Sequence, residues 1–203
     1  ISAQGEKSDL RVSGSHGYQQ GLVPNTWLNT LNLNTTAGYN LTEKLRFETN
    51  VNYNRQFTDN FPDVTYGPNS LIYNVATWTG ADYDIEAFNP KAGGSYWQKG
   101  KEGVQQIYAE YQRYNNPYFS AYEWLRGLYK TDIYGYALAK YSLTDYLNIQ
   151  LRSQLSSYDL LRNEKMPYSA GAYSRDERKG DYREDKRALI ENNTDLLITL
   201  DKD

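Results

Sequence analysis

The side chains able to perform catalysis are few and scattered in this sequence. His16 is the only histidine, and no serine or cysteine motif accompanies it, so we interpret it as a structural residue. Asp82, Asp84 and Glu86 do not have the spacing of an EF-hand loop and are interpreted as part of a solvated loop. The glycine-to-lysine spacing in residues 93–101 does not fit a phosphate-binding loop. We therefore expect no enzyme, no cofactor and no metal site.

Aromatic rings form the one cluster with functional promise. The chain has 21 tyrosines and 4 tryptophans, against one methionine and no cysteine. An apolar ring with a polar group suits sugar-binding surfaces, protein partners and membrane-water interfaces. The residues predicted to contact a ligand or a partner are Trp78, Tyr83, Tyr96, Trp97 and Tyr111. The alternative, in which the rings form the packed interior of a large folded loop, remains open.

Polar and apolar side chains alternate strictly between Thr30 and Phe57, interrupted only by a short polar turn at 42–44. Such alternation predicts two long strands with one apolar and one polar face each. The same hairpin pattern returns at 139–147, where the turn is 144–146. The polar faces carry the residues that we predict to line a water-filled lumen, namely Arg46, Glu48, Asn50, Asn52, Arg152 and Gln154.

Strands of about 10 residues suit a tilted crossing of a membrane. Further strands are expected at 8–18 and 194–200, giving a total of about six. The two short turns alternate with long connections at 58–129 and 159–190, an asymmetry typical of short periplasmic turns and long extracellular loops. A closed outer-membrane barrel needs about 8 strands or more. We expect the remaining strands to lie outside this sequence.

The long connections have predicted features of their own. Residues 102–114 have the apolar spacing of a short amphipathic helix, and residues 70–79 form a second predicted helix. Charges of both signs alternate in residues 175–187, which predicts a solvated loop.

Composition excludes several classes of protein. A mean hydropathy of -0.83 and the lack of a long apolar run exclude a transmembrane helix, whereas barrel strands, apolar only at alternate residues, remain compatible. The net charge of -3, with both signs mixed, argues against nucleic-acid binding. Residues 1–4 have neither a charged nor an apolar leader region, so we expect no signal peptide in this sequence.

Several short motifs occur in a particular order along nearly the whole chain. They are GLVPNT at 21–26, LTEKL at 41–45, NNPYF at 115–119, TDIYG at 131–135, YSLTDYL at 141–147 and NTDLL at 193–197. In this order and spacing they resemble the SusC/RagA-type TonB-dependent transporters of the Bacteroidota outer membrane. The resemblance implies a barrel of about 22 strands, an N-terminal plug domain, a SusD-like lipoprotein lid and energy delivered by TonB through the plug. It also implies oligosaccharide or peptide substrates, without choosing between them.

The expected fold is thus all-β: residues 1–203 form part of a single antiparallel transmembrane β-barrel domain in the bacterial outer membrane, with the plug domain and the other strands absent from this sequence. The expected function is TonB-dependent import of oligosaccharides or peptides together with a SusD-like lipoprotein. One alternative is a SusC-like barrel that acts as a scaffold in a larger assembly, since fold does not fix function. The other is a soluble β-sandwich that binds carbohydrate, which ranks third.

Overall fold

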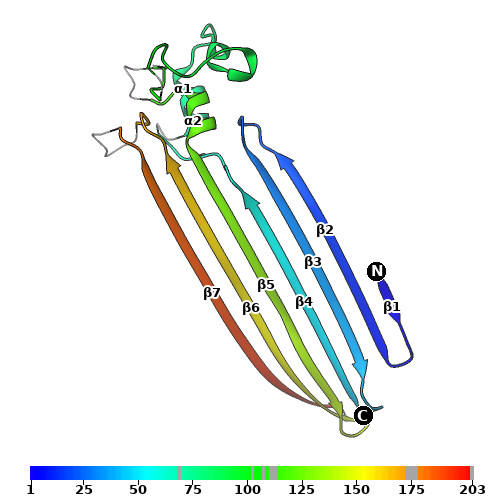
Figure 1. Ribbon diagram of the computed structural model, residues 1–203. Coiled ribbons are helices and arrows are strands. Elements are labelled where there is room, and N and C mark those ends of the chain that lie inside the picture. The colour runs from blue at the N-terminus through cyan, green and yellow to red at the C-terminus, as the bar shows by residue number, and fades with distance from the viewer. Residues whose placement is uncertain (68–69, 102, 107, 110–113, 172–177, 202–203) are drawn as a thin grey trace.

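A single antiparallel sheet dominates the structure. The computed structural model describes residues 1–203 except 68–69, 102, 107, 110–113, 172–177 and 202–203. Its seven strands lie in chain order, so each pairs with its neighbour in sequence and the sheet is an open meander (Figure 1). The strands are β1 (Ser2–Gln4), β2 (Ser8–Gln20), β3 (Trp27–Asn40), β4 (Leu45–Thr58), β5 (Leu125–Ser142), β6 (Leu147–Met166) and β7 (Asp181–Leu200).

The prediction of an all-β antiparallel fold is confirmed, but two predicted boundaries are wrong. The predicted connection at 159–190 is largely strand, because β6 continues to Met166 and β7 begins at Asp181. The predicted loop at 175–187 falls partly outside the described residues, and its second half, 181–187, belongs to β7. Every side chain of β7 but that of Asp185 is exposed, and such an edge strand accepts charges that a buried strand would reject.

The two predicted hairpin turns are confirmed and have the same geometry. In the first, the Leu41 amide donates to the Leu45 carbonyl at 2.9 Å, and in the second the Leu143 amide donates to the Leu147 carbonyl at 2.9 Å. Thr42 stabilises the first turn because its hydroxyl accepts from the Leu45 amide at 3.0 Å. The repeated sequence pattern therefore corresponds to a repeated turn.

The strand register sorts the side chains onto two faces. Odd residues of β3 to β6 share one face with even residues of β2 and β7, because side chains alternate along a strand. We call this the apolar face, and its exposed large side chains include Leu10, Leu33, Tyr39, Phe47, Val51, Ile133, Tyr141, Leu151, Leu155, Leu196 and Ile198. The opposite side, which carries most of the Asn, Arg and acidic side chains together with a few leucines, is the polar face.

The connection between β4 and β5, residues 59–124, folds at one end of the sheet (Figure 1). It contains α1 (Leu71–Trp78), η1 (Ile85–Phe88), η2 (Pro90–Ala92) and α2 (Pro117–Glu123). The helix predicted at 70–79 is confirmed; Ser70 caps it by accepting from the Tyr73 amide at 3.2 Å. Among the described residues, no helix is long and apolar enough to span a membrane.

The helix predicted at 102–114 is wrong for the part of that range that the structure describes. Gln105 forms an antiparallel bridge with Trp97, and Tyr114 forms one with Ala109. Positions 107 and 111 of the helical pattern lie outside the described residues, whereas Tyr108 and Tyr114 reach one shared core from a chain segment that is not helical. That core, formed with residues beyond the connection, comprises Phe88, Tyr96, Tyr108, Tyr114, Tyr118, Phe119, Trp124, Met166 and Ala170.

Candidate functional site on the polar face

The four predicted residues of β4 lie together on the polar face, and Arg46 organises one end of the group. Its Nη2 lies 2.6 Å from Asp9 Oδ1 and its Nε lies 2.7 Å from Glu48 Oε1. Its Nη1 donates to Asn40 Oδ1 at 3.1 Å. The guanidinium lies across Gly38, where any Cβ would collide with it. These ion pairs are about one-third exposed, so each contributes about 0–1 kcal/mol, and their main effect is to fix the direction of the charges.

An amide ladder continues this face away from Arg46. Asn34 donates to Asn52 Oδ1 at 2.6 Å, and Asn52 donates in turn to Asn50 Oδ1. Asn50 donates to Thr36 Oγ1 at 2.8 Å. The ladder is uncharged and presents both donors and acceptors, a combination suited to hydroxyl or peptide groups in water.

The two predicted residues of β6 share the face but form a separate group. The register aligns Glu48, Leu138 and Arg152 in one row, so a strand separates the two groups. Arg152 pairs with Asp195 at 2.8 Å, and Gln154 is exposed. Between the groups, β5 places Tyr134 and Tyr136 on the same face. Their alternation with Ile133, Gly135 and Ala137 was the signal that could have identified them.

The predicted aromatic residues have different environments. Tyr96 is buried in the loop core, and Trp97 packs edge-to-face on Phe119, with ring centroids 5.5 Å apart. Trp78 is 37% exposed and Tyr83 is 39% exposed. Tyr111 lies outside the described residues. The packed-interior alternative thus describes Tyr96 and Trp97, whereas ligand or partner contact by Trp78 and Tyr83 stays a prediction.

The loop core holds tyrosines in their neutral form. Burial raises the pKa of Tyr118 to about 12, and the hydrogen bond from its hydroxyl to Glu86 Oε1, 2.9 Å, acts in the same direction. Hydrogen bonds from Asn89 and Tyr118 lower the pKa of Glu86. Burial likewise raises the pKa of Tyr96, whose hydroxyl donates to Glu123 at 2.7 Å. Within the described ranges, no group of His, Cys, Asp and Glu side chains could hold a metal ion.

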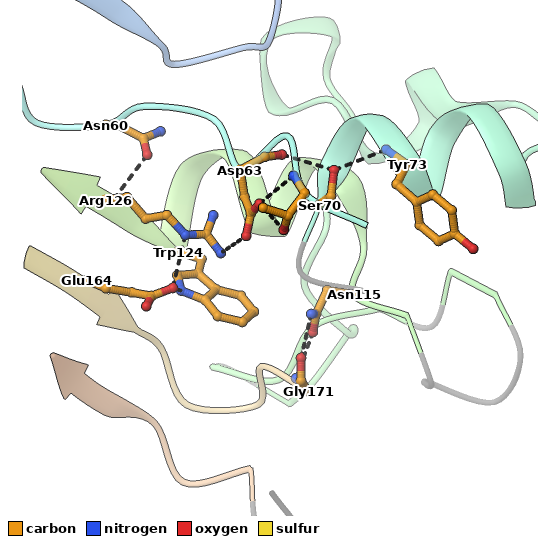
Figure 2. A network of polar contacts seen from close by, with 10 residues as sticks. Asn60, Asp63, Ser70, Tyr73, Asn115, Trp124, Arg126, Glu164 and Gly171 are labelled. Atoms are coloured by element: carbon orange, nitrogen blue, oxygen red, sulfur yellow. Dashed lines mark hydrogen bonds and ion pairs between the residues drawn. The ribbon is translucent and has the colours of Figure 1, made fainter. Parts of the chain in front are cut away.

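Hydrogen bonds join the 59–124 connection to the β6–β7 connection. Asn115 Nδ2 donates to the Gly171 carbonyl at 2.7 Å, and the Gly171 amide donates to Asn115 Oδ1 at 2.7 Å (Figure 2). Gln105 donates to the Ser169 carbonyl at 2.6 Å. Asn116 caps α2 by accepting from the amides of Tyr118 and Phe119. The motif at 115–119 therefore has a structural task, which is to start α2 and to fix the connection in place.

Arg126, at the junction of the connection and the sheet, is the most buried cation of the polar face, with 8% of its surface exposed (Figure 2). Its Nε donates to Glu164 Oε1 at 3.0 Å, and its Nη2 lies 3.6 Å from Asp63 Oδ2. Trp124 Nε1 donates to the same Glu164 oxygen at 2.8 Å, and its ring lies 4.6 Å from Arg126 Cζ. A guanidinium this buried needs such partners, because an unpaired buried charge is strongly destabilising.

Two neighbouring pockets lie beside this junction on the polar face. The larger, about 350 Å³, is lined by apolar side chains and by neutral amides and hydroxyls, among them Gln19, Leu28, Gln56, Thr58, Phe61 and Leu128. The smaller, about 140 Å³, is lined by charged side chains, namely Arg126, Arg162, Glu164, Arg183 and Asp185, and again by Phe61. A hollow of about 390 Å³ on the apolar face, beside Ala137 and Ala139, has almost no polar lining and is a poor candidate for specific recognition.

No residue of this junction was predicted as a site residue from the sequence. Arg126 fell within the predicted connection at 58–129, and Arg162 and Arg183 fell within the predicted connection at 159–190. No motif marks these residues, since only the pairing of β5, β6 and β7 brings them together. No protein-family model matches the chain, and no curated protein matches it significantly.

Proposed function

We propose that this chain forms part of the wall of a bacterial outer-membrane β-barrel that imports oligosaccharides or peptides with a SusD-like surface lipoprotein. One observation carries the proposal: a meander of long strands has an exposed face with many large apolar side chains and an opposite face of amides and ion pairs. Large exposed apolar areas mark interaction or membrane surfaces. A barrel wall in lipid has this division, with apolar residues outside and a polar interior.

The dimensions of the apolar face support the proposal. On β5 the stretch between the rings of Tyr129 and Tyr141 covers residues 131–139, nine residues or about 30 Å of strand. A tilt of about 40° reduces that height to about 23 Å, close to the ~25 Å apolar band of such barrels. Tyr39 and Tyr141 lie at the end nearest the turns, whereas Tyr18, Trp27 and Phe57 lie at the other. Aromatic rings at both margins are typical of a membrane band.

The unpaired edges of the sheet favour the presence of further strands. β7 has no partner on its outer edge among the described residues, and β1 with Ile1 covers only Asp9 to Val12 of β2. Unpaired edges of this length invite pairing, and closure of a barrel removes them. In the proposed protein, the polar face lines the lumen. The short turns face the periplasm and the 59–124 connection faces outward, where Trp78 and Tyr83 are available to the lipoprotein or the substrate.

Energy would reach such a barrel from TonB through a plug domain. The scaffold alternative is favoured by one observation, namely that the large connection is held by buried hydrogen bonds at Asn115 and Gln105. A fixed connection suits a permanent assembly partner. The β-sandwich alternative is weaker, because β5, β6 and β7 have 18 to 20 residues, far more than the usual five or six, and the described residues form a single sheet.

Gel mobility of the unheated and boiled full-length protein, extracted from outer membranes, tests the proposal. We expect a heat-dependent shift, since closed barrels resist detergent until boiled. Recovery of a folded protein in the soluble fraction without a shift would contradict the barrel and revive the sandwich. Growth on individual glycans and peptides after deletion of the gene then separates transport from scaffolding, because only a transporter deletion abolishes growth on its substrate.

A further inference from the structure

The acids of the charged pocket are already engaged by other groups. Glu164 accepts from both Arg126 and Trp124 at 3.0 Å and 2.8 Å. Asp185 is bound in two places by Arg187, at 3.0 Å through Nη2 and at 3.3 Å through Nε. Each carboxylate thus already pairs with an arginine other than Arg162 and Arg183.

Two arginines of the same pocket are left without an anionic partner among the described residues. Arg162 lies opposite Asp185 in the register and Arg183 lies opposite Glu164, yet neither forms an ion pair there. Both are exposed, and both line the pocket of about 140 Å³. As diagonal neighbours on adjacent strands they are separated by roughly 7–8 Å at the backbone. Side chains of this length can converge on one anion from two sides.

Arg126 provides a second, independent indication of an anion. Its Nη2 is buried and makes no hydrogen bond within the described part of the chain, while Asp63 Oδ2 remains at 3.6 Å. A buried donor without a hydrogen bond is costly, and an anion in the adjoining pocket would relieve part of that cost. Glu164 and Asp63 balance the charge of Arg126, but its Nη2 still lacks a hydrogen-bond acceptor, and Arg162 and Arg183 lack an anionic partner among the described residues. These unmet groups favour an anionic ligand over a cationic one.

The larger pocket lies directly beyond Phe61, whose side chain lines both spaces. It has about 350 Å³, apolar walls from Leu28 and Leu128, and no charged residue in its lining. Gln19 and Gln56 supply neutral amides. A space of this kind accepts an apolar side chain next to a backbone amide.

We propose that the two pockets form one subsite for a ligand whose carboxylate lies beside an apolar group, as in a peptide that ends in an apolar residue. The carboxylate pairs with Arg162 and Arg183, and the apolar side chain occupies the pocket beyond Phe61. A neutral oligosaccharide offers no charge to the arginines. An acidic sugar has the carboxylate but no apolar group for the larger pocket. The inference rests on the proposed function, because the polar face must be open to substrate in the lumen.

Calorimetric titration of the full-length protein in detergent tests whether the carboxylate of the ligand contributes to binding. The probes are a tripeptide ending in leucine, its C-terminal amide and a uronic-acid disaccharide. We expect amidation to weaken binding about tenfold or more, as for loss of a charged hydrogen bond. The double variant Arg162→Gln, Arg183→Gln should weaken the free acid to the same extent and leave the amide unchanged. The control variant Lys165→Gln removes a charge at the same height of the sheet but on the apolar face. It should change the binding of neither the free acid nor the amide.

A pocket-filling variant tests the apolar half. Leu128→Trp should weaken the tripeptide ending in leucine but not one ending in glycine. Equal binding of acid and amide by the unmodified protein would overturn the inference. Preference for the uronic-acid disaccharide, with the same dependence on the arginines, would also overturn it by assigning the carboxylate to a sugar.

The gel shift separates failure of the subsite from failure of the proposed function. A retained heat-dependent shift with no effect of the arginine variants removes the subsite and leaves the barrel. Loss of the shift in the unmodified protein removes the barrel itself.

Discussion

The sheet and the 59–124 connection place their apolar side chains in opposite ways. On the sheet, Phe47 and Leu151 are 45% and 49% exposed although both belong to a long run of regular strand. In the connection, Phe119 is fully buried and Trp124 is 2% exposed although regular structure there is short. The connection therefore has a core of its own, and the sheet does not. The comparison indicates that the sheet depends on surroundings that its own residues do not supply, whereas the connection is held by internal packing.

Phe119→Ala offers the largest test of this contrast. The substitution leaves a cavity in the loop core and should destabilise the connection by about 4 kcal/mol. Hydrogen exchange of the 59–124 amides in the full-length protein measures the effect. The matched change Phe47→Ala on the apolar face should leave the exchange of these amides unchanged, because Phe47 lies opposite Tyr39 and Ala139, at the end of β4 away from the connection. A similar cost for both phenylalanines would mean that the two regions do not differ as described.

Arg126→Met should have the next largest effect, because it leaves Glu164 and Asp63 without their cation. Both carboxylates retain some exposure, 30% and 18% of their side chains, and regain part of their hydration. We therefore expect a loss of about 3 kcal/mol, at the lower end for a broken buried pair. Limited proteolysis between residues 59 and 124 checks it. Unchanged cleavage would show that the pairs do not hold the connection on the sheet.

Asn115→Ala removes the hydrogen bonds to Gly171 and one from Gln105 in a fully buried position. The expected loss is about 2 kcal/mol, seen as faster hydrogen exchange in both connections at once. Asn193→Ala is the control, since its side chain bonds only Glu191 on the exposed edge strand and should cost almost nothing. Faster exchange confined to one connection would contradict the coupling.

The smallest expected effect is the pH dependence of stability that Tyr118 contributes. Its pKa is raised from an ordinary 10.0 to about 12, so the neutral phenol is favoured in the folded connection. Its contribution to stability is fully present below about pH 10 and is lost as the pH rises to about 12. Ultraviolet difference titration of the protein against Tyr118→Phe should show one phenol with this late titration. The variant itself should cost about 1 kcal/mol. Titration of Tyr118 near pH 10 would mean an exposed ring.

The sequence predicted the sheet better than the site for a physical reason. Alternation and turns are local, so β3, β4 and the turns after Asn40 and Ser142 could be read from neighbouring residues. The length of β7 was missed because charge alternation resembles a loop unless the strand is known to lie at an edge. The junction was missed because Arg126 and Glu164 are far apart in the chain and meet only through pairing of β5 with β6, and Asp63 joins them only when the connection folds back onto β5.

The order of the strands also determines how the sheet can assemble. The β3–β4 and β5–β6 pairs each join strands separated by one tight turn, so each hairpin can form without waiting for distant residues. Pairing of β4 with β5 must instead close the whole 59–124 connection, at a larger entropic cost. We expect this closure to be the slow step between two rapidly formed hairpins. Once its core has packed, the connection holds the adjoining ends of β4 and β5 close together. The chain then samples fewer conformations before the two strands pair.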